Sequence, residues 1–302
     1  MSKMKIYDTR MVAKKLAEFI TPEPLRAFLA DKVKGKSFSV LEPSIGSGQL
    51  LFNLLDRIKS VCGYDTNELA LACALENISD AELHNQDFIT SDIKKHDIAI
   101  CNYPFSLRPT EVQKAYILKD AFLSQFYKNK VTGVLDFIFI LKSFNAVDEG
   151  FYLCFPGIGY RQQEKRFREY LIQNRFIREY GLIEECKFEH TGISILFLHL
   201  TKQPNERINS FRLNLKTGEK IEKEVTLQDT FETPHVEQLR LEYDPVDLEK
   251  NARESAFNSF KTQVQMSIFV QCIDEQIQRE LQPVDVWLEN CINELKALIA
   301  KD

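Results

Sequence analysis

The sequence predicts an α/β fold: a doubly wound, mostly parallel sheet with a C-terminal hairpin and a helical appendage. Short apolar runs alternate with amphipathic helical patterns, as in repeated strand–helix–strand units. The first run leads into a glycine loop at 46–48, and the run Asp97 to Cys101 is apolar enough for a strand buried on both faces. Such sheets bind ligands at the carboxyl ends of their strands.

The expected elements follow in chain order. Two short helices are expected within 10–33, broken at Thr21–Pro24, with Thr21 as the cap of the second helix. Strands are expected at 37–42, 60–65, 82–84, 97–101, 150–155, 177–183 and 193–200, and helices at 49–58, 68–77, 111–127, 133–146 and 164–174. After Asn205 the pattern predicts a hairpin of 211–215 with 220–225, and beyond Pro245 two amphipathic helices separated at Pro283.

Composition narrows the class of protein. The 302 residues, 44% hydrophobic and 27% charged, are ordinary for a soluble globular chain. We expect no membrane span and no signal peptide, since no apolar stretch is long enough and the N-terminus has no apolar core. Seven scattered cysteines without a C-x-x-C pair fit reduced thiols in the cytoplasm. Neither they nor the five histidines have metal-ligand spacing, so no metal site is expected.

Charge is unevenly distributed along the chain. The net charge is −5, and residues 244–302 carry 11 acidic against 6 basic side chains, so the remainder is neutral. Within that remainder, residues 161–178 hold six basic side chains. This segment is either a solvated helix face or a surface that contacts phosphates. The candidates for nucleic-acid contact are Arg161, Lys165, Arg166 and Arg168.

Motifs at successive strand ends predict a nucleoside cofactor site. The glycines of Glu42–Gly48 let the backbone turn sharply and approach a ligand. Asp65 ends the next strand and is placed to accept hydrogen bonds from both ribose hydroxyls. Asp87 is placed to accept from an adenine amino group while Phe88 covers the ring. Each alone could be a turn or core residue, but their order favours a cofactor site, and the absence of G-x-x-x-x-G-K-[ST] disfavours ATP.

The segment Asn102–Phe105 ends the strand at 97–101. Its amide, proline and aromatic residues suit the binding of a planar amine and stacking on its ring, although Phe105 could also be a core aromatic.

These motifs resemble those of N6-adenine DNA methyltransferases of the gamma arrangement, and most of all the catalytic core of type I restriction-modification methylase subunits. Asn102–Phe105 resembles the N-P-P-F/Y box with Tyr103 in place of the first proline, and Glu42–Gly48 resembles the D-P-A-C-G-S-G loop. Phe19–Pro22 resembles the motif beside the methionine end of the cofactor, and 150–156, 167–171 and 188–197 resemble later segments in the same order, within about residues 10–202.

The resemblance implies an enzyme that uses S-adenosylmethionine to methylate N6 of a flipped-out adenine in DNA, in restriction-modification or in defence against phage and mobile elements. The Asn102 side-chain oxygen and the carbonyl of residue 103 would accept hydrogen bonds from the target amine, and Phe105 would stack on the base. Tyr103 supplies the carbonyl without the fixed φ of proline. The expected catalytic residues are Asn102, Tyr103, Pro104 and Phe105; the expected cofactor-binding residues are Thr21, Glu42, Pro43, Ser44, Gly46, Gly48, Asp65, Asp87, Phe88 and Asn102.

We therefore expect three parts: an N-terminal helical cap of the cofactor site at 1–36, a catalytic domain at 37–202, and a C-terminal region at 203–302 for recognition or partner binding. The type I resemblance implies DNA as substrate, with a specificity subunit or a second copy docked on the C-terminal helices; those helices could instead pack on the core. Two other functions stay open: an N-methyltransferase of RNA adenine or protein glutamine, and a cofactor-binding subunit without turnover. The sequence names no target site.

Overall fold

The computed structural model describes residues 20–127, 130–188, 191–226 and 230–234, together with Glu289, Ile292, Asn293 and Lys296. The chain divides into two units, 1–236 and 237–302. The four described residues of the second unit are helical. Apart from these four residues, the helices predicted beyond Pro245 lie outside the described residues. The helix predicted before Thr21 lies outside them as well. Among the described residues, no helix has the length and apolarity needed to cross a membrane.

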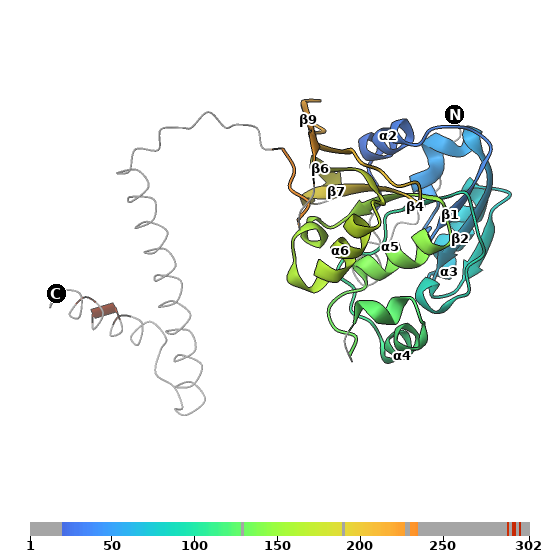
Figure 1. Ribbon diagram of the computed structural model, residues 1–302, viewed down its shortest axis with the longest axis horizontal. Coiled ribbons are helices and arrows are strands. Elements are labelled where there is room, and N and C mark those ends of the chain that lie inside the picture. The colour runs from blue at the N-terminus through green and yellow to red at the C-terminus, as the bar shows by residue number, and fades with distance from the viewer. Residues whose placement is uncertain are drawn as a thin grey trace. The chain divides into compact units, whose positions relative to one another are not determined.

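The described residues of the first unit form one nine-stranded sheet in the order β3-β2-β1-β4-β5-β7-β6-β8-β9 (Figure 1). The run from β3 to β5 is parallel, and β7 is antiparallel to both of its neighbours. This order confirms the doubly wound, mostly parallel class. The strands are β1 (Phe38–Glu42), β2 (Ile58–Asp65), β3 (Glu82–Asn85), β4 (Ile98–Cys101), β5 (Glu149–Cys154), β6 (Ile177–Phe188), β7 (Thr191–Thr201), β8 (Ile208–Asn214) and β9 (Lys220–Val225).

Two of the predicted helices differ from the observed ones. The segment predicted as a helix at 49–58 is a 3₁₀ helix, Gln49–Arg57, and the segment 111–127 is divided into α4 and a 3₁₀ turn at Leu123–Phe126. The predicted cap Thr21 is also wrong, because Pro22 precedes the first helical residue and no side chain caps that end. The α-helices are α2 (Glu23–Lys32), α3 (Glu68–Asn77), α4 (Glu111–Lys119), α5 (Asp136–Asn145) and α6 (Lys165–Gln173).

Helices cover both faces of the sheet, which explains why its central strands are apolar throughout. Successive side chains of a strand point to opposite faces. On β1, Val40 belongs to the apolar cluster that includes Leu25 of α2, whereas Leu41 belongs to the cluster that includes Ile138 of α5. All four residues of β4 are buried for the same reason.

The predicted C-terminal hairpin extends the main sheet. Strands β8 and β9 pair antiparallel, as predicted, and β8 also pairs in parallel with β6 from Glu179↔Asn209 to Glu184↔Asn214. The residues after 202 therefore continue the sheet of the predicted catalytic domain, and the division of the chain falls after residue 236.

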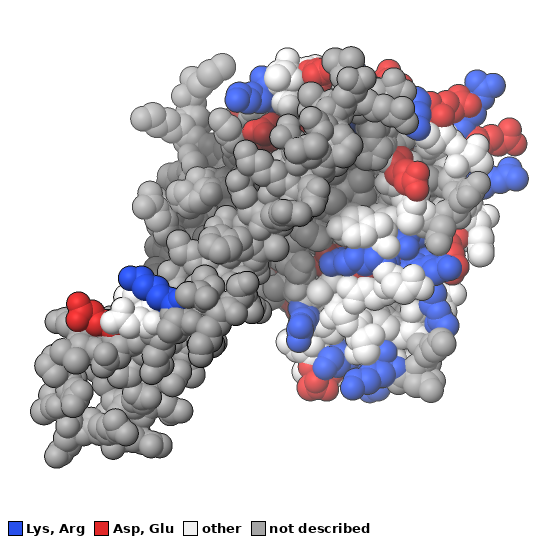
Figure 2. Space-filling view, turned by 90° about the vertical axis from the view of Figure 1, so that its left-hand side faces the viewer, with Lys and Arg blue, Asp and Glu red and all other residues white. Residues whose placement is uncertain are grey.

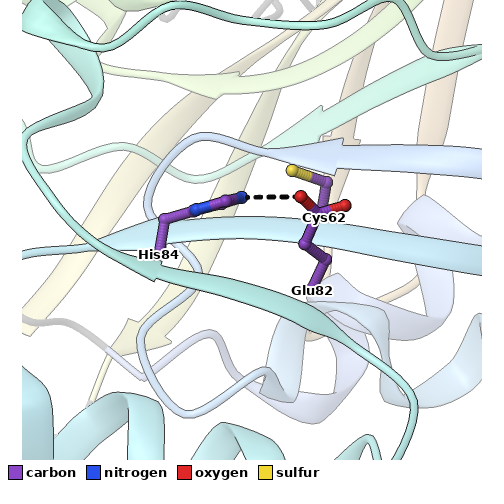
Figure 3. A group of neighbouring side chains, drawn as sticks. All are labelled: Cys62, Glu82 and His84. Carbon is purple, nitrogen blue, oxygen red and sulfur yellow. Dashed lines mark ion pairs between the residues drawn. The ribbon is translucent and has the colours of Figure 1, made fainter.

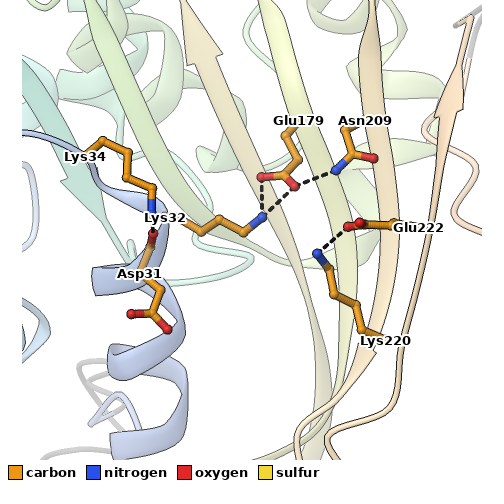
Figure 4. Close-up of polar contacts among 7 residues, drawn as sticks. All are labelled: Asp31, Lys32, Lys34, Glu179, Asn209, Lys220 and Glu222. Atoms are coloured by element: carbon orange, nitrogen blue, oxygen red, sulfur yellow. Dashed lines mark hydrogen bonds and ion pairs between the residues drawn. The ribbon is translucent and has the colours of Figure 1, made fainter.

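An ion pair attaches α2 to the sheet (Figure 4). The Lys32 ammonium at the end of α2 lies 2.5 and 2.6 Å from the carboxylate oxygens of Glu179 on β6, and Asn209 of β8 donates to the same carboxylate at 2.9 Å. The ammonium also lies 4.8 Å from the centre of the Phe211 ring. Only 20% and 11% of the Lys32 and Glu179 side chains are exposed, so the pair is largely screened from water.

We expect Glu179→Ala to lower the free energy of unfolding by about 1–3 kcal/mol, because it leaves a largely buried ammonium without its carboxylate. Urea denaturation followed by far-UV circular dichroism measures this. The control is Glu206→Ala, which removes an exposed pair with Arg175 and should cost less than about 1 kcal/mol. Equal losses in the two variants would contradict the anchoring role.

Candidate functional site

A pocket of about 350 Å³ lies at the carboxyl ends of the parallel strands. It is formed by the chain before α2, the loop after β1, and the residues that follow β2, β3 and β4. Parallel pairing brings these strand ends to one edge of the sheet. Of the predicted cofactor residues, Glu42 and Gly48 do not line the pocket, whereas Thr21, Pro43, Ser44, Gly46, Asp65, Asp87, Phe88 and Asn102 do.

The loop after β1 needs its glycines. Gly46 and Gly48 have φ of 53° and 76°, in the left-handed region. A Cβ on Gly48 would also come within 2.9 Å of the Ile78 side chain, so this glycine lets the loop pack closely against Ile78. Glu42 is fully buried below the loop, and burial raises the pKa of its carboxyl well above the usual range. Glu42 does not line the pocket, and its contact with the cofactor stays a prediction.

Asp65 ties the loop to β2. Its carboxylate accepts hydrogen bonds from the backbone N–H of Gly46 at 2.9 Å and of Asn67 at 2.8 Å. Burial raises the pKa of Asp65, and these backbone donors act in the opposite direction. A carboxylate has about four acceptor positions, so it can still bind ribose hydroxyls. Asp65 therefore has a loop-positioning role that the sequence did not indicate.

The pocket wall after β3 is held by neighbours far along the chain. One Asp87 oxygen caps the short 3₁₀ turn by accepting from the N–H of Ile89, and the other accepts from the Gln113 amide at 2.9 Å. The buried Phe88 ring stacks on Phe139 of α5, with centroids 5.8 Å apart. Gln113 and Phe139 also line the pocket. Nothing in the local sequence marked them, because each acts through the packing of α4 or α5.

Asn102 has its amide nitrogen held and its oxygen unpaired. The nitrogen donates to the Thr21 hydroxyl at 2.9 Å, and the Ser44 hydroxyl donates to the Asn102 backbone carbonyl at 3.3 Å. The side-chain oxygen is buried and has no hydrogen-bond partner among the described residues. A buried acceptor without a donor is costly, so this oxygen is suited to receive an N–H from a ligand.

Tyr103 is a core residue. Its ring is 1% exposed, stacks on Phe139 with centroids 5.7 Å apart and meets Phe105 edge-on, also at 5.7 Å. Phe105 is partly buried and does not line the pocket, whereas Pro104 does. The tyrosine that departs from the family box thus supports the wall formed by Phe139. The stacking role of Phe105 stays a prediction.

A buried carboxylate fixes the turn that follows the box. Ser106 has φ of 60°, and its N–H donates to Asp136 at 2.8 Å. Asp136 is fully buried, and its other oxygen lies 3.4 Å from the Arg161 guanidinium, which also lies 2.7 Å from Glu164. Sequence reasoning missed Asp136, because only the fold brings the start of α5 beside residue 106.

The predicted phosphate contacts fall into two groups. Arg168 is 1% exposed and donates to the carbonyls of Ile158 and Arg161, and Arg161 is paired with two buried acids. The predicted contact of Arg161 and Arg168 with phosphates does not agree with this placement, because Arg168 is buried and the charge of Arg161 is already paired. Arg166 is exposed and Lys165 is partly so, 3.9 Å from Glu169. Figure 2 shows Lys and Arg side chains gathered on the lower part of one described face, with acids among them.

The comparison that decides the family is a match of residues 6–271 to the model of the N-6 DNA methylases. The chain belongs to this family. It is 29% identical over 229 residues to the type II methyltransferase M.HincII of Haemophilus influenzae, a match that covers 72% of this chain and 44% of that protein. The match to M.HindII, from a strain of the same species, is also 29% identical and covers 42% of that protein. The chain thus spans less than half the length of these curated relatives.

Solved structures show the same fold. The type I restriction-modification methyltransferase subunit from Streptococcus thermophilus superposes with a TM-score of 0.56 at 19% identity, covering 68% of this chain and 50% of that one. A modification subunit of a putative type I restriction enzyme from Vibrio vulnificus gives 0.55 at 16% identity, covering 68% and 49%. A putative class I S-adenosylmethionine-dependent methyltransferase from Listeria monocytogenes gives 0.50 at 19% identity, covering 65% of each chain.

The family's cofactor is S-adenosylmethionine, and the pocket fits it. Asp65 offers carboxylate oxygens for hydroxyls, Asp87 offers an acceptor, and the Phe88 ring offers an apolar face, all in one pocket. Gly46 lines the pocket without a side chain, which permits close approach of the ligand.

We expect Asp65→Ala to weaken S-adenosylmethionine binding by about 1–3 kcal/mol, since it removes a charged acceptor and releases the Gly46 N–H. Isothermal calorimetry with the cofactor alone measures this. Asp56→Ala, at an exposed position on the Gln49–Arg57 helix, is the control and should bind like the wild type. An unchanged affinity in Asp65→Ala would rule out its role in the pocket.

Proposed function

We propose that this protein is a site-specific methyltransferase that transfers a methyl group from S-adenosylmethionine to N6 of a flipped-out adenine in DNA, as part of restriction-modification. The observation that carries this proposal is the buried side-chain oxygen of Asn102, which has no hydrogen-bond partner among the described residues and lies in a pocket whose residues fit the cofactor. We also propose that the reaction takes place in the cytoplasm.

The chemistry requires the target amine to be made nucleophilic. The lone pair of an aromatic amine is delocalised into its ring. The Asn102 oxygen and the backbone carbonyl of Tyr103 would accept the two amine hydrogens, which localises the lone pair and orients it. Bound S-adenosylmethionine supplies a methyl group on a sulfonium, so alignment of the two reactants accounts for most of the rate. Thr21 keeps the amide oxygen available by holding the amide nitrogen.

Adenine in a duplex cannot reach a pocket of this kind. It must leave the stack at a cost of a few kcal/mol, and stacking on Phe105 would return about 1–3 kcal/mol. Of the predicted phosphate contacts, Lys165 and Arg166 are the two that the structure leaves near the surface. They are the residues of this set that we assign to the DNA backbone.

We infer that a second chain, either a separate specificity subunit or another copy, shares in DNA recognition. The acidic segment 244–302 would repel phosphates. The solved structures of similar fold include subunits of type I restriction-modification systems. These two observations support the inference.

We expect Asn102→Ala to abolish methyl transfer while the affinity for S-adenosylmethionine changes little, because the unpaired oxygen acts on the amine. Single-turnover labelling with tritiated cofactor on unmethylated DNA, RNA and protein measures transfer and identifies the substrate class. Asn174→Ala, on the surface at the end of α6, is the matched control. A fully active Asn102→Ala would refute the mechanism, and labelling of RNA or protein alone would refute the DNA substrate.

We expect Asp136→Ala to lower the single-turnover rate by about 10- to 100-fold, since a small displacement of the box misaligns the amine. Asp136→Asn should recover part of the rate, because its amide oxygen can still accept from the Ser106 N–H. Cofactor affinity, measured in parallel, should stay near the wild-type value in both. Equal rates in the two variants would show that the hydrogen bond to Ser106 does not position the box.

A further inference from the structure

Three side chains of kinds that bind metal ions lie together on β2 and β3 (Figure 3). They are Cys62, Glu82 and His84. In the parallel register, Cys62 is opposite Glu82, and His84 is two residues further along β3, so all three lie on one face of the sheet. The sulfur, the carboxylate oxygen and the imidazole nitrogen lie within 4.8 Å of one another, and Nε2 of His84 is 3.2 Å from Oε1 of Glu82.

The surroundings hold this group in place on one side and leave it open on the other. The His84 ring is stacked on Tyr64, with centroids 4.6 Å apart, and the Cys62 thiol lies in the core. Glu82 is exposed, since 55% of its side chain is accessible to solvent. An ion could therefore enter from the Glu82 side and keep a water molecule there.

The charges of the group favour a cation. Glu82 brings a carboxylate beside the Cys62 sulfur and the His84 imidazole. Among the described residues, Lys94 is the lysine that pairs with Glu82. The Lys94 ammonium lies 3.6 Å from Oε1 of Glu82. The Lys94 side chain is 83% exposed, so it can turn into solvent when a metal ion binds Glu82.

We propose that Cys62, Glu82 and His84 bind one divalent transition-metal ion of the zinc class, with a fourth position open to water. Sulfur, imidazole and carboxylate ligands suit zinc and disfavour magnesium and calcium. Zinc–ligand bonds of about 2.0–2.3 Å place tetrahedral ligand atoms about 3–4 Å apart, so small side-chain rotations suffice. On binding, the thiol gives its proton to solvent as the sulfur–metal bond forms, and Lys94 moves away from Glu82.

The ion would hold the edge of the sheet. Within the described sheet, β3 is the last strand of the order and pairs with β2 alone. It leads directly to Asp87 and Phe88, and Tyr64 contacts the Phe88 ring at 5.5 Å between centroids. A metal between β2 and β3 would thus stabilise the strand that leads into one wall of the cofactor pocket. This inference does not depend on the substrate proposed above.

Titration of the reduced, chelator-treated full chain with Co²⁺ and Zn²⁺ alone tests the proposal. The wild type should bind one Co²⁺ with a thiolate-to-cobalt charge-transfer band. Cys62→Ser should remove the band, and both Cys62→Ser and His84→Asn should weaken zinc binding by about tenfold or more. Cys73→Ser, which changes a partly buried thiol on α3, is the matched control and should leave band and affinity unchanged.

Lys94→Gln gives a test that nonspecific binding would not pass. It removes the competing cation from an exposed position, so it should tighten zinc binding without disturbing the fold. The proposal is overturned if the wild type binds no metal at micromolar concentrations, if the band persists in Cys62→Ser, or if Lys94→Gln weakens binding. Circular dichroism of each variant verifies that it is folded.

Discussion

The parallel pairing of β2, β1 and β4 is the constraint on which the site depends. It brings three strand ends to one edge, and hydrogen bonds between those ends then fix the backbone. Asp65 holds the Gly46 N–H, and the Ser44 hydroxyl reaches the Asn102 carbonyl. The loop of the first strand is therefore positioned by the second strand on one side and by the fourth on the other. Without that adjacency, none of the three motifs would form a pocket.

The helix α2 adds a constraint across the chain. Its last residue, Lys32, is paired with β6, and the chain just before its first residue presents Thr21 to the Asn102 amide. The orientation of the Asn102 side chain is thus connected, through a single short helix, to a strand about 80 residues further on. At the box, the Asn102 side-chain oxygen and the Tyr103 hydroxyl are buried without a hydrogen-bond partner among the described residues, and of the two only Asn102 lines the pocket.

The sequence predicted the elements that follow from local apolar spacing. It did not predict contacts between residues that lie far apart along the chain. The bounds of α3 and the ends of β2 and β4 follow from apolar spacing and from the residues at their termini. The burial of Arg168 was not predictable, because a basic residue on an amphipathic helix normally faces water, and its acceptors are carbonyls of a loop whose path is set by tertiary packing. The contact of Asp136 with Ser106 and the grouping of Cys62 with Glu82 and His84 escaped for the same reason: each joins segments separated by about 20–30 residues.

The buried ring of Tyr103 limits how this chain can change. In the family box a proline stands at this position, but here the tyrosine ring fills space beside Phe139 and Phe105. Exchange for proline would remove a large core side chain and leave a cavity, at a cost of about 3–5 kcal/mol. Residues 103 and 139 are in contact, so the effects of their substitutions on stability will not be additive. An evolutionary path from tyrosine to proline at position 103 would therefore need a compensating substitution at or near residue 139 first. The residue at this position of the box and the side chains of helix α5 would thus have to change together.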